Sequence, residues 1–163
     1  YLSFHDALTG LYNWAYFNEK IKTIQKTGDL LITFIVADVD GLKYVNDTYG
    51  HYRGDLLIKE ISNILKDNFR DEDIIARTGG DEFCIILPGI LKEEAERIVQ
   101  RIKKKCLLLS SKRLPLSISF GIAEKKTEDV SIKKILREAE KLMYEKKFIK
   151  KLSMNINSPR RSK

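Results

Sequence analysis

The sequence predicts an α/β domain in which helices cover a buried sheet. Residues 30–37 form an almost continuous apolar run rich in β-branched side chains, which is typical of a central strand covered on both faces. Residues 73–78 and 82–87 are apolar segments that flank Gly79 and Gly80, and this pattern predicts a β-hairpin. Longer segments between these strands carry apolar residues at helical spacing, which predicts amphipathic helices.

The other elements are predicted in order along the chain. Residues 2–25 form a helical pattern that is broken near Thr9 and Gly10. Residues 116–123 alternate as a strand does, with apolar side chains on one face. Four further helices are expected at 42–48, 55–69, 91–109 and 132–148. Since no repeat or linker interrupts the chain, we expect one domain over residues 1–152 and a disordered C-terminal tail over 153–163.

Composition limits the classes of function. The 163 residues carry a formal net charge of +7, and 43% of them are hydrophobic, which is typical of a globular domain that attracts anions. The aromatic side chains do not interleave with the Lys and Arg runs, which argues against a nucleic-acid-binding surface. The longest apolar run has about eight residues, whereas a membrane span needs roughly 20. Cys84 and Cys106 lack metal-binding spacing, so we expect reduced, buried thiols in a cytoplasmic protein.

Carboxylates gather at two predicted turns. Asp38 and Asp40 follow the central strand two positions apart, so their side chains point to the same side. Asp81 and Glu82 lie at the hairpin tip, where the two glycines let a phosphate approach closely. Converging carboxylates are ligands that Mg²⁺ uses together with substrate phosphates in phosphoryl transfer. The alternative is a pair of ordinary turns, because Asp and Gly are common in turns for reasons unrelated to catalysis.

A second polar cluster surrounds a loop predicted at 49–54. Lys43 offers a positive charge to a phosphate. Asn46 and Asp55 together suit a guanine edge, because a carboxylate accepts hydrogen bonds from the N1 and N2 donors of guanine. Asp55 is equally well placed to cap the helix that follows, and a lone histidine such as His51 is more often structural than catalytic.

Several motifs together resemble one known family. Residues 77–83, RTGGDEF, are similar to the signature of GGDEF-domain diguanylate cyclases. Residues 6–13 (DALTGLYN) resemble the family's opening motif, and residues 38–55 (DVDGLKYVNDTYGHYRGD) resemble its second block. Residues 117–123 and 139–147 resemble its closing strand and helix, so the similarity covers about residues 2–151. The resemblance implies a cyclase-like, polymerase-palm-like fold with a mixed, mainly antiparallel sheet of about five strands surrounded by helices.

The resemblance also implies an activity and a set of site residues. A diguanylate cyclase condenses two GTP molecules into cyclic di-GMP and two pyrophosphates across a homodimer. By resemblance, Asp81 helps to deprotonate the ribose 3′-hydroxyl, and Asp38, the Val39 carbonyl and Glu82 hold Mg²⁺, or Mn²⁺ in its place. The residues implied to contact the guanine and the triphosphate are Gly41, Leu42, Lys43, Asn46, His51, Asp55, Gly79, Gly80, Lys147 and Lys151.

The resemblance also implies a product-binding site, and two positions of this sequence differ from the family pattern. Arg70 and Asp73 match the family's Arg-x-x-Asp inhibitory site for cyclic di-GMP, with Arg101 contributing from the next helix; the alternative is a solvated charge cluster at a helix end. Trp14 replaces an arginine of the family pattern, and Lys151 replaces an arginine that assists phosphate binding. Lysine keeps the charge but lacks the planar fork of arginine, so we expect weaker nucleotide binding.

Two functions stay open for the whole chain. The first is an active cyclase, which the intact signature favours. The alternative is a catalytically weak GGDEF domain that binds cyclic di-GMP or GTP as a regulatory module. The chain begins inside a helical pattern and without methionine. We therefore expect it to be a piece of a longer signalling protein with an N-terminal sensor domain, located in the cytoplasm or at the cytoplasmic side of a membrane anchor.

Overall fold

A computed structural model describes residues 4–28, 31–127 and 129–156 of the chain. The strands are β1 (Tyr12–Asn13), β2 (Ile32–Val39), β3 (Ile74–Arg77), β4 (Glu82–Pro88) and β5 (Ile118–Lys125). The helices are α1 (Trp14–Thr27), α2 (Leu42–Tyr49), α3 (His51–Lys66), α4 (Lys92–Leu109) and α5 (Ile132–Ile156). The strands form one sheet in the order β1-β3-β4-β2-β5. β1 pairs with β3 in parallel and the other pairs are antiparallel, which confirms the predicted mixed sheet.

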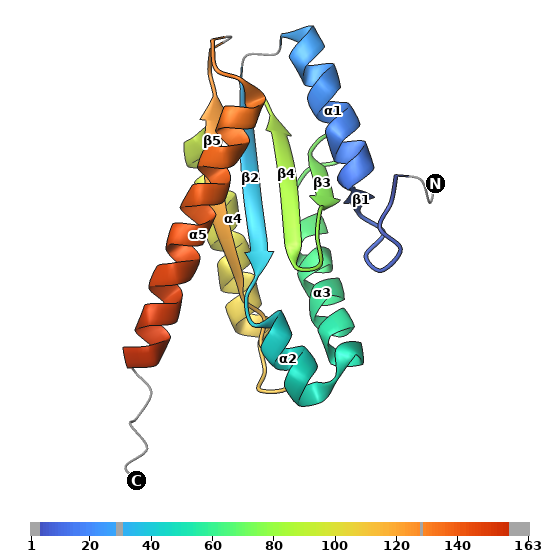
Figure 1. Ribbon diagram of the computed structural model, residues 1–163, viewed down its shortest axis with the longest axis vertical. Coiled ribbons are helices and arrows are strands. Elements are labelled where there is room, and N and C mark those ends of the chain that lie inside the picture. Colours follow the sequence, from blue (N-terminus) through green and yellow to red (C-terminus); the bar gives the residue numbers. More distant parts are fainter. Residues whose placement is uncertain (1–3, 29–30, 128, 157–163) are drawn as a thin grey trace.

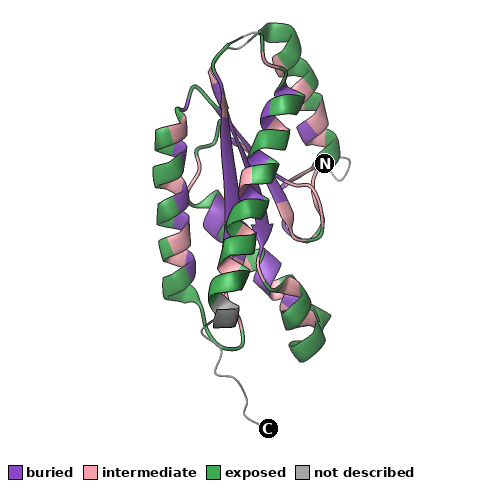
Figure 2. Ribbon diagram, turned by 60° about the vertical axis from the view of Figure 1, so that its left-hand side comes forward, coloured by how far each residue is buried: buried purple, intermediate pink, exposed green. Residues whose placement is uncertain are grey.

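Helices pack on both faces of the sheet, as Figure 1 shows. All eight residues of β2 are buried, because β4 and β5 flank the strand and helices cover it on both sides. Phe34 and Val36 pack in one apolar cluster with residues of α1 and α5. Ile35 and Ala37 point to the opposite face and pack in the cluster that includes α3 and α4. The buried strands and the exposed outer faces of the helices are visible in Figure 2.

The first predicted helix is wrong in its N-terminal half. The described residues before β1 form turns, because local polar groups satisfy the backbone better there than a helix would. Asp6 Oδ1 accepts hydrogen bonds from the Thr9 amide at 2.9 Å and from the Thr9 hydroxyl at 2.7 Å. Gly10 follows with a positive φ of 67°. The helix begins only at Trp14, after Asn13 has capped it by accepting from the Tyr16 amide at 3.2 Å.

Two further boundaries differ from the predicted ones. The predicted loop over 49–54 is wrong, because only Gly50 separates α2 from α3, with a φ of 86° that favours glycine. α5 continues to Ile156, beyond the predicted end at 148, and residues 157–163 of the predicted tail lie outside the described residues. Within the described ranges, no helix combines the length and the apolar character needed to cross a membrane.

Both cysteines are buried and unpaired. Burial raises the pKa of the Cys84 and Cys106 thiols to about 11. Since only the thiolate is a good nucleophile, neither side chain is poised for chemistry at neutral pH.

Candidate active site

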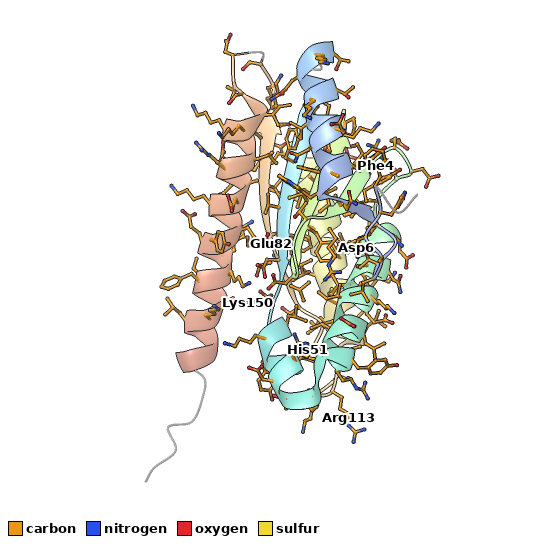
Figure 3. All side chains as sticks on the ribbon, turned by 45° about the vertical axis from the view of Figure 1, so that its right-hand side comes forward. Phe4, Asp6, His51, Glu82, Arg113 and Lys150 are labelled. Carbon is orange, nitrogen blue, oxygen red and sulfur yellow. The ribbon has the colours of Figure 1, made fainter. Side chains whose placement is uncertain are left out.

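The end of β2 and the tip of the β3–β4 hairpin lie against each other. Asp38 and Glu82 are directly opposite residues in the antiparallel pairing of β2 with β4, so the predicted convergence of the two carboxylates is confirmed. The Val39 amide donates a hydrogen bond to the Asp81 carbonyl at 2.9 Å, which attaches the hairpin tip to the end of β2. Figure 3 labels Glu82 on β4, Lys150 on α5 and His51 at the start of α3.

The hairpin tip is braced by Arg77, for which the sequence analysis offered no role. Its guanidinium donates to the Gly80 carbonyl at 2.7 Å and forms an ion pair with Asp6 at 3.1 Å. Burial alone would raise the pKa of Asp6, but hydrogen bonds from Thr9 and Arg77 hold that pKa below its usual value. A charged Asp6 therefore anchors Arg77, and Arg77 fixes the backbone next to Asp81.

The two hairpin glycines have different surroundings. A Cβ atom on Gly79 would lie 2.8 Å from Oε2 of Glu82, so the missing side chain makes room for that carboxylate. A Cβ atom on Gly80 would meet nothing within 4 Å, which leaves the tip of the hairpin open to a ligand. The pair thus positions Glu82 on one side and keeps the approach clear on the other.

The site carries an excess of negative charge. Burial, together with repulsion from Asp81 and Asp40, raises the pKa of the Asp38 carboxyl, and the nearby Lys147 only partly offsets this. Burial and the proximity of Asp38 also raise the pKa of Glu82. Lys147 Nζ donates to Asp38 Oδ1 from α5. Two ammonium groups, Lys147 on Asp38 and Lys150 on Asp40, therefore face four carboxylates, an arrangement that still favours an added cation.

Asp38 and Glu82 could hold a hard divalent cation through their carboxylate oxygens. Among the described residues, no group of three or more His, Cys, Asp or Glu side chains is arranged to hold a metal ion by itself. This donor set fits Mg²⁺, which usually binds through one or two carboxylates and completes its shell with water and substrate phosphates.

The segment around α2 and α3 contains an unsatisfied polar atom. Asn46 Oδ1 is buried and has no hydrogen-bond partner among the described residues. A Cβ atom on Gly54 would lie 1.8 Å from the same oxygen, so Gly54 lets α3 approach α2 at this point. Asp55 follows Gly54 as an exposed residue inside α3, and the alternative that it caps the helix is wrong because the cap position is occupied by Gly50. His51 and Lys43 are also exposed.

The lysines of α5 differ in their contacts. Lys147 donates to Asp38, so it lies beside the two paired carboxylates, and its implied contact with the triphosphate stays a prediction. Lys151 is exposed, and its neighbour Lys150 instead forms an ion pair with Asp40 at 2.7 Å. Lys150 gave no family signal and was missed, since only the rotation of the helix decides which of two adjacent lysines faces the sheet.

Arg70 and Asp73 lie together at a second place. Arg70 Nη2 and Asp73 Oδ1 are 2.6 Å apart, and the Asp73 side chain is fully buried. Both residues line a hollow of about 360 Å³ next to β1 and β3. Arg101 donates from α4 to the Asn68 side chain at 2.8 Å. Arg70 and Arg101 are therefore both held by contacts with neighbouring side chains, Asp73 and Asn68.

The sequence matches the family model described as "Diguanylate cyclase, GGDEF domain" over residues 3–151. The chain belongs to the GGDEF family. It is 36% identical over 143 residues to the uncharacterized protein YtrP of Bacillus subtilis, covering 87% of this GGDEF domain and 24% of YtrP. It is 33% identical over 135 residues to diguanylate cyclase A of Treponema denticola, covering 79% of the chain and 36% of that protein. The chain thus spans about a quarter to a third of these relatives.

A solved structure shows the same fold. The GGDEF domain of DgcB from Caulobacter crescentus, crystallised in complex with cyclic di-GMP, superposes on this domain with a TM-score of 0.78 at 25% identity. The match covers 88% of this chain and 90% of the DgcB chain. The palm-like arrangement of sheet and helices is therefore that of a GGDEF domain.

Proposed function

We propose that this GGDEF domain is a diguanylate cyclase. Each copy binds one GTP, and two copies face each other to form cyclic di-GMP and two pyrophosphates. The observation that carries the proposal is the pairing of Asp38 with Glu82 beside an open hairpin tip, in a site with too little positive charge to balance its carboxylates.

Guanine recognition is assigned to Asn46 and Asp55. The buried Asn46 Oδ1 lacks a hydrogen-bond donor in the part of the chain that the structure describes, and leaving such an atom unpaired costs about 1–3 kcal/mol. The exposed Asp55 carboxylate accepts from the N1 and N2 groups of guanine, and the Asn46 amide pairs elsewhere on the ring once it turns away from Gly54. Adenine lacks this donor pair, so the same oxygens favour GTP over ATP.

Asp81 is assigned the proton transfer. It lies at the hairpin tip beside the open approach over Gly80, where it accepts the proton of the ribose 3′-hydroxyl. The 3′-oxygen then attacks the α-phosphorus of the opposing GTP, and the bond to the bridging oxygen of pyrophosphate breaks. Lys43 and Lys147 bind the phosphates of the triphosphate. Asp38 and Glu82 would hold Mg²⁺, which would supply positive charge for the phosphate oxygens.

The assignment of catalysis is tested by conversion of GTP with Mg²⁺, with the product identified by chromatography. Asp81→Asn and Glu82→Gln are expected to lower turnover at least about 100-fold, because a positioned acid–base group contributes roughly 10²–10⁴. Glu138→Gln, which removes an exposed carboxylate on α5, serves as the matched control. Undiminished turnover in both site variants would contradict the assignment. A wild-type chain that binds cyclic di-GMP without turning over GTP would favour the regulatory module instead.

We also propose product feedback at Arg70 and Asp73. The GGDEF domain of DgcB binds cyclic di-GMP, and here the Arg70–Asp73 pair lines a hollow next to β3. Arg70→Ala is expected to weaken cyclic di-GMP binding about tenfold or more, since hydrogen bonds to charged groups contribute roughly 1.5–3 kcal/mol. Titration calorimetry measures this, with the exposed Arg97→Ala as control. Equal affinity in wild type and Arg70→Ala would exclude this site.

The relatives imply a regulatory partner within the same polypeptide. YtrP and diguanylate cyclase A are both several times longer than the matched region. We propose that a further domain of the whole protein controls how two GGDEF domains meet. Such control suits a domain that binds one GTP, because the reaction then depends on how two copies are brought together.

A further inference from the structure

Asp40 has no role in the proposed chemistry, yet several hydrogen bonds hold its side chain in place. It is the first residue after β2, and its side chain is largely buried, with 14% of its surface exposed. Ser117 Oγ donates to its Oδ2 at 2.7 Å and Ser119 Oγ donates to its Oδ1 at 2.8 Å. Lys150 Nζ, from α5, donates to Oδ2 at 2.7 Å and also to Ser117 Oγ. Two segments distant in sequence, β5 and α5, therefore converge on one carboxylate.

The backbone at Asp40 is fixed as well. Its amide donates to the Ser117 carbonyl at 2.9 Å, which extends the contact with the start of β5. Gly41 follows in the left-handed region, with a φ of 75°, and is the residue from which α2 begins. The Gly41 carbonyl accepts from the Val45 amide at 3.0 Å. Fixing Asp40 therefore fixes the start of α2, where the proposed triphosphate contacts with Gly41, Leu42 and Lys43 lie.

Lys150 is not arranged as a direct ligand of the substrate. An ammonium group has three N–H donors, and two of those on Lys150 are committed to Asp40 and Ser117. Three side chains of the described residues donate hydrogen bonds to the Asp40 carboxylate. Those of Ser117 and Ser119 are neutral hydroxyls, and that of Lys150 is charged. Figure 3 shows Lys150 on α5 beside the end of β2.

We infer that Lys150 is a positioning residue, which acts through Asp40 to fix the loop that binds the GTP triphosphate. The inference rests on the proposed function. Without the ammonium group of Lys150, the Asp40 carboxylate keeps two hydroxyl donors among the described residues, while Lys103 and Lys147 act on it from beyond ion-pair distance. The largely buried carboxylate is then poorly compensated, so it turns toward solvent. The turn at Gly41 then loses its anchor, and the phosphate-binding amides and Lys43 lose their alignment.

A double-mutant cycle separates this role from direct phosphate binding. The variants are Lys150→Met, Asp40→Asn and the two combined, with Lys146→Met as a control that removes an exposed lysine one turn earlier on the same helix. Lys150→Met is expected to raise the KM for GTP about tenfold, within the range of coupling between contacting residues. We expect kcat to change less, because the loop holds the triphosphate in both ground state and transition state. Since the two residues act as a unit, the combined variant should be no worse than Asp40→Asn alone.

Other outcomes would overturn the inference. If the effects of Lys150→Met and Asp40→Asn multiply, Lys150 acts on GTP directly. If Lys150→Met leaves KM unchanged, or if Lys146→Met raises it equally, the contact with Asp40 has no role in binding. Lys150→Arg keeps the charge and should recover most of the wild-type KM. Thermal melting of each variant shows that the assays are done on folded protein.

The inference can fail separately from the proposed function. If the wild-type chain turns over GTP and the cycle shows no coupling, only the role of Lys150 is wrong. If the wild-type chain does not turn over GTP, the cyclase proposal fails, and the same four variants are compared by their calorimetric affinity for GTP with Mg²⁺. A tenfold weaker affinity in Lys150→Met, without a further loss in the combined variant, would still support the positioning role.

Discussion

At the scale of single residues, the site is built from unfavourable charges. Asp38 and Glu82 are opposite each other in the sheet, and burial raises the pKa of both carboxyls. Their charged forms are therefore less stable in the folded domain than in the unfolded chain. Such a cost is typical of positions retained for function rather than for stability.

This cost predicts how stability depends on pH. The pKa of Glu82 is raised by folding, so its ionisation destabilises the fold above the folded-state pKa and has no effect below the unfolded-state value near 4.5. In metal-free buffer, Glu82→Gln should therefore melt roughly 1–2 °C higher than wild type at neutral pH, a modest effect because solvent screens a partly exposed charge. The difference should vanish as the pH falls through this window. Glu138→Gln is the control, and a Glu82→Gln variant that melts lower than wild type at neutral pH would contradict the assignment.

Sequence patterns predicted some residue contacts and missed others for a physical reason. The convergence of Asp38 and Glu82 follows from a strand and a hairpin with known alternation, so it was predictable. The ion pair of Arg77 with Asp6 joins residues 71 positions apart, and no local pattern encodes it. The choice of Lys150 over Lys151 depends on how α5 is rotated against the sheet, which packing sets.

At the scale of elements, α5 is the part that brings both lysines to the site. It packs against β5, where Gly121 allows a close approach of the helix backbone: a Cβ atom there would lie 1.7 Å from the Ala139 carbonyl oxygen and 2.5 Å from the Met143 nitrogen. Strand and helix types were predictable from apolar spacing, whereas this backbone contact was not. The failure of the first predicted helix has a similar origin, because Asp6, Thr9 and Asn13 replaced helical hydrogen bonds with local ones.

The close approach predicts a sensitive position. Gly121→Ala should lower the free energy of unfolding by about 1–3 kcal/mol or more, because backbone atoms cannot move aside as a side chain can. It should also weaken GTP use, since α5 carries Lys147 and Lys150. Urea denaturation measures the first effect. Gly80→Ala, whose Cβ atom would meet nothing within 4 Å, is the control for stability alone. A change in Gly121→Ala within 0.5 kcal/mol, the usual range for surface substitutions, would show that the helix can shift at little cost.

At the scale of the whole molecule, the proposed function makes the domain half of a catalytic unit. One chain provides one Asp38–Glu82 pair and one proposed guanine site at Asn46 and Asp55, so two GTP molecules require two copies. Each copy carries a formal net charge of +7, and like charges oppose the association of isolated domains. We therefore expect weak pairing of the isolated domain and a reaction rate that is limited by encounter.

The most direct test is the rate of cyclic di-GMP formation from GTP and Mg²⁺, measured over a range of concentrations of the isolated chain. The rate per molecule of protein should rise with protein concentration and level off once most copies are paired. Asp81→Asn should stay inactive across the range. A wild-type chain that forms no cyclic di-GMP at any concentration would contradict the cyclase proposal, and a constant rate per molecule down to the lowest concentration would contradict weak pairing of two half-sites.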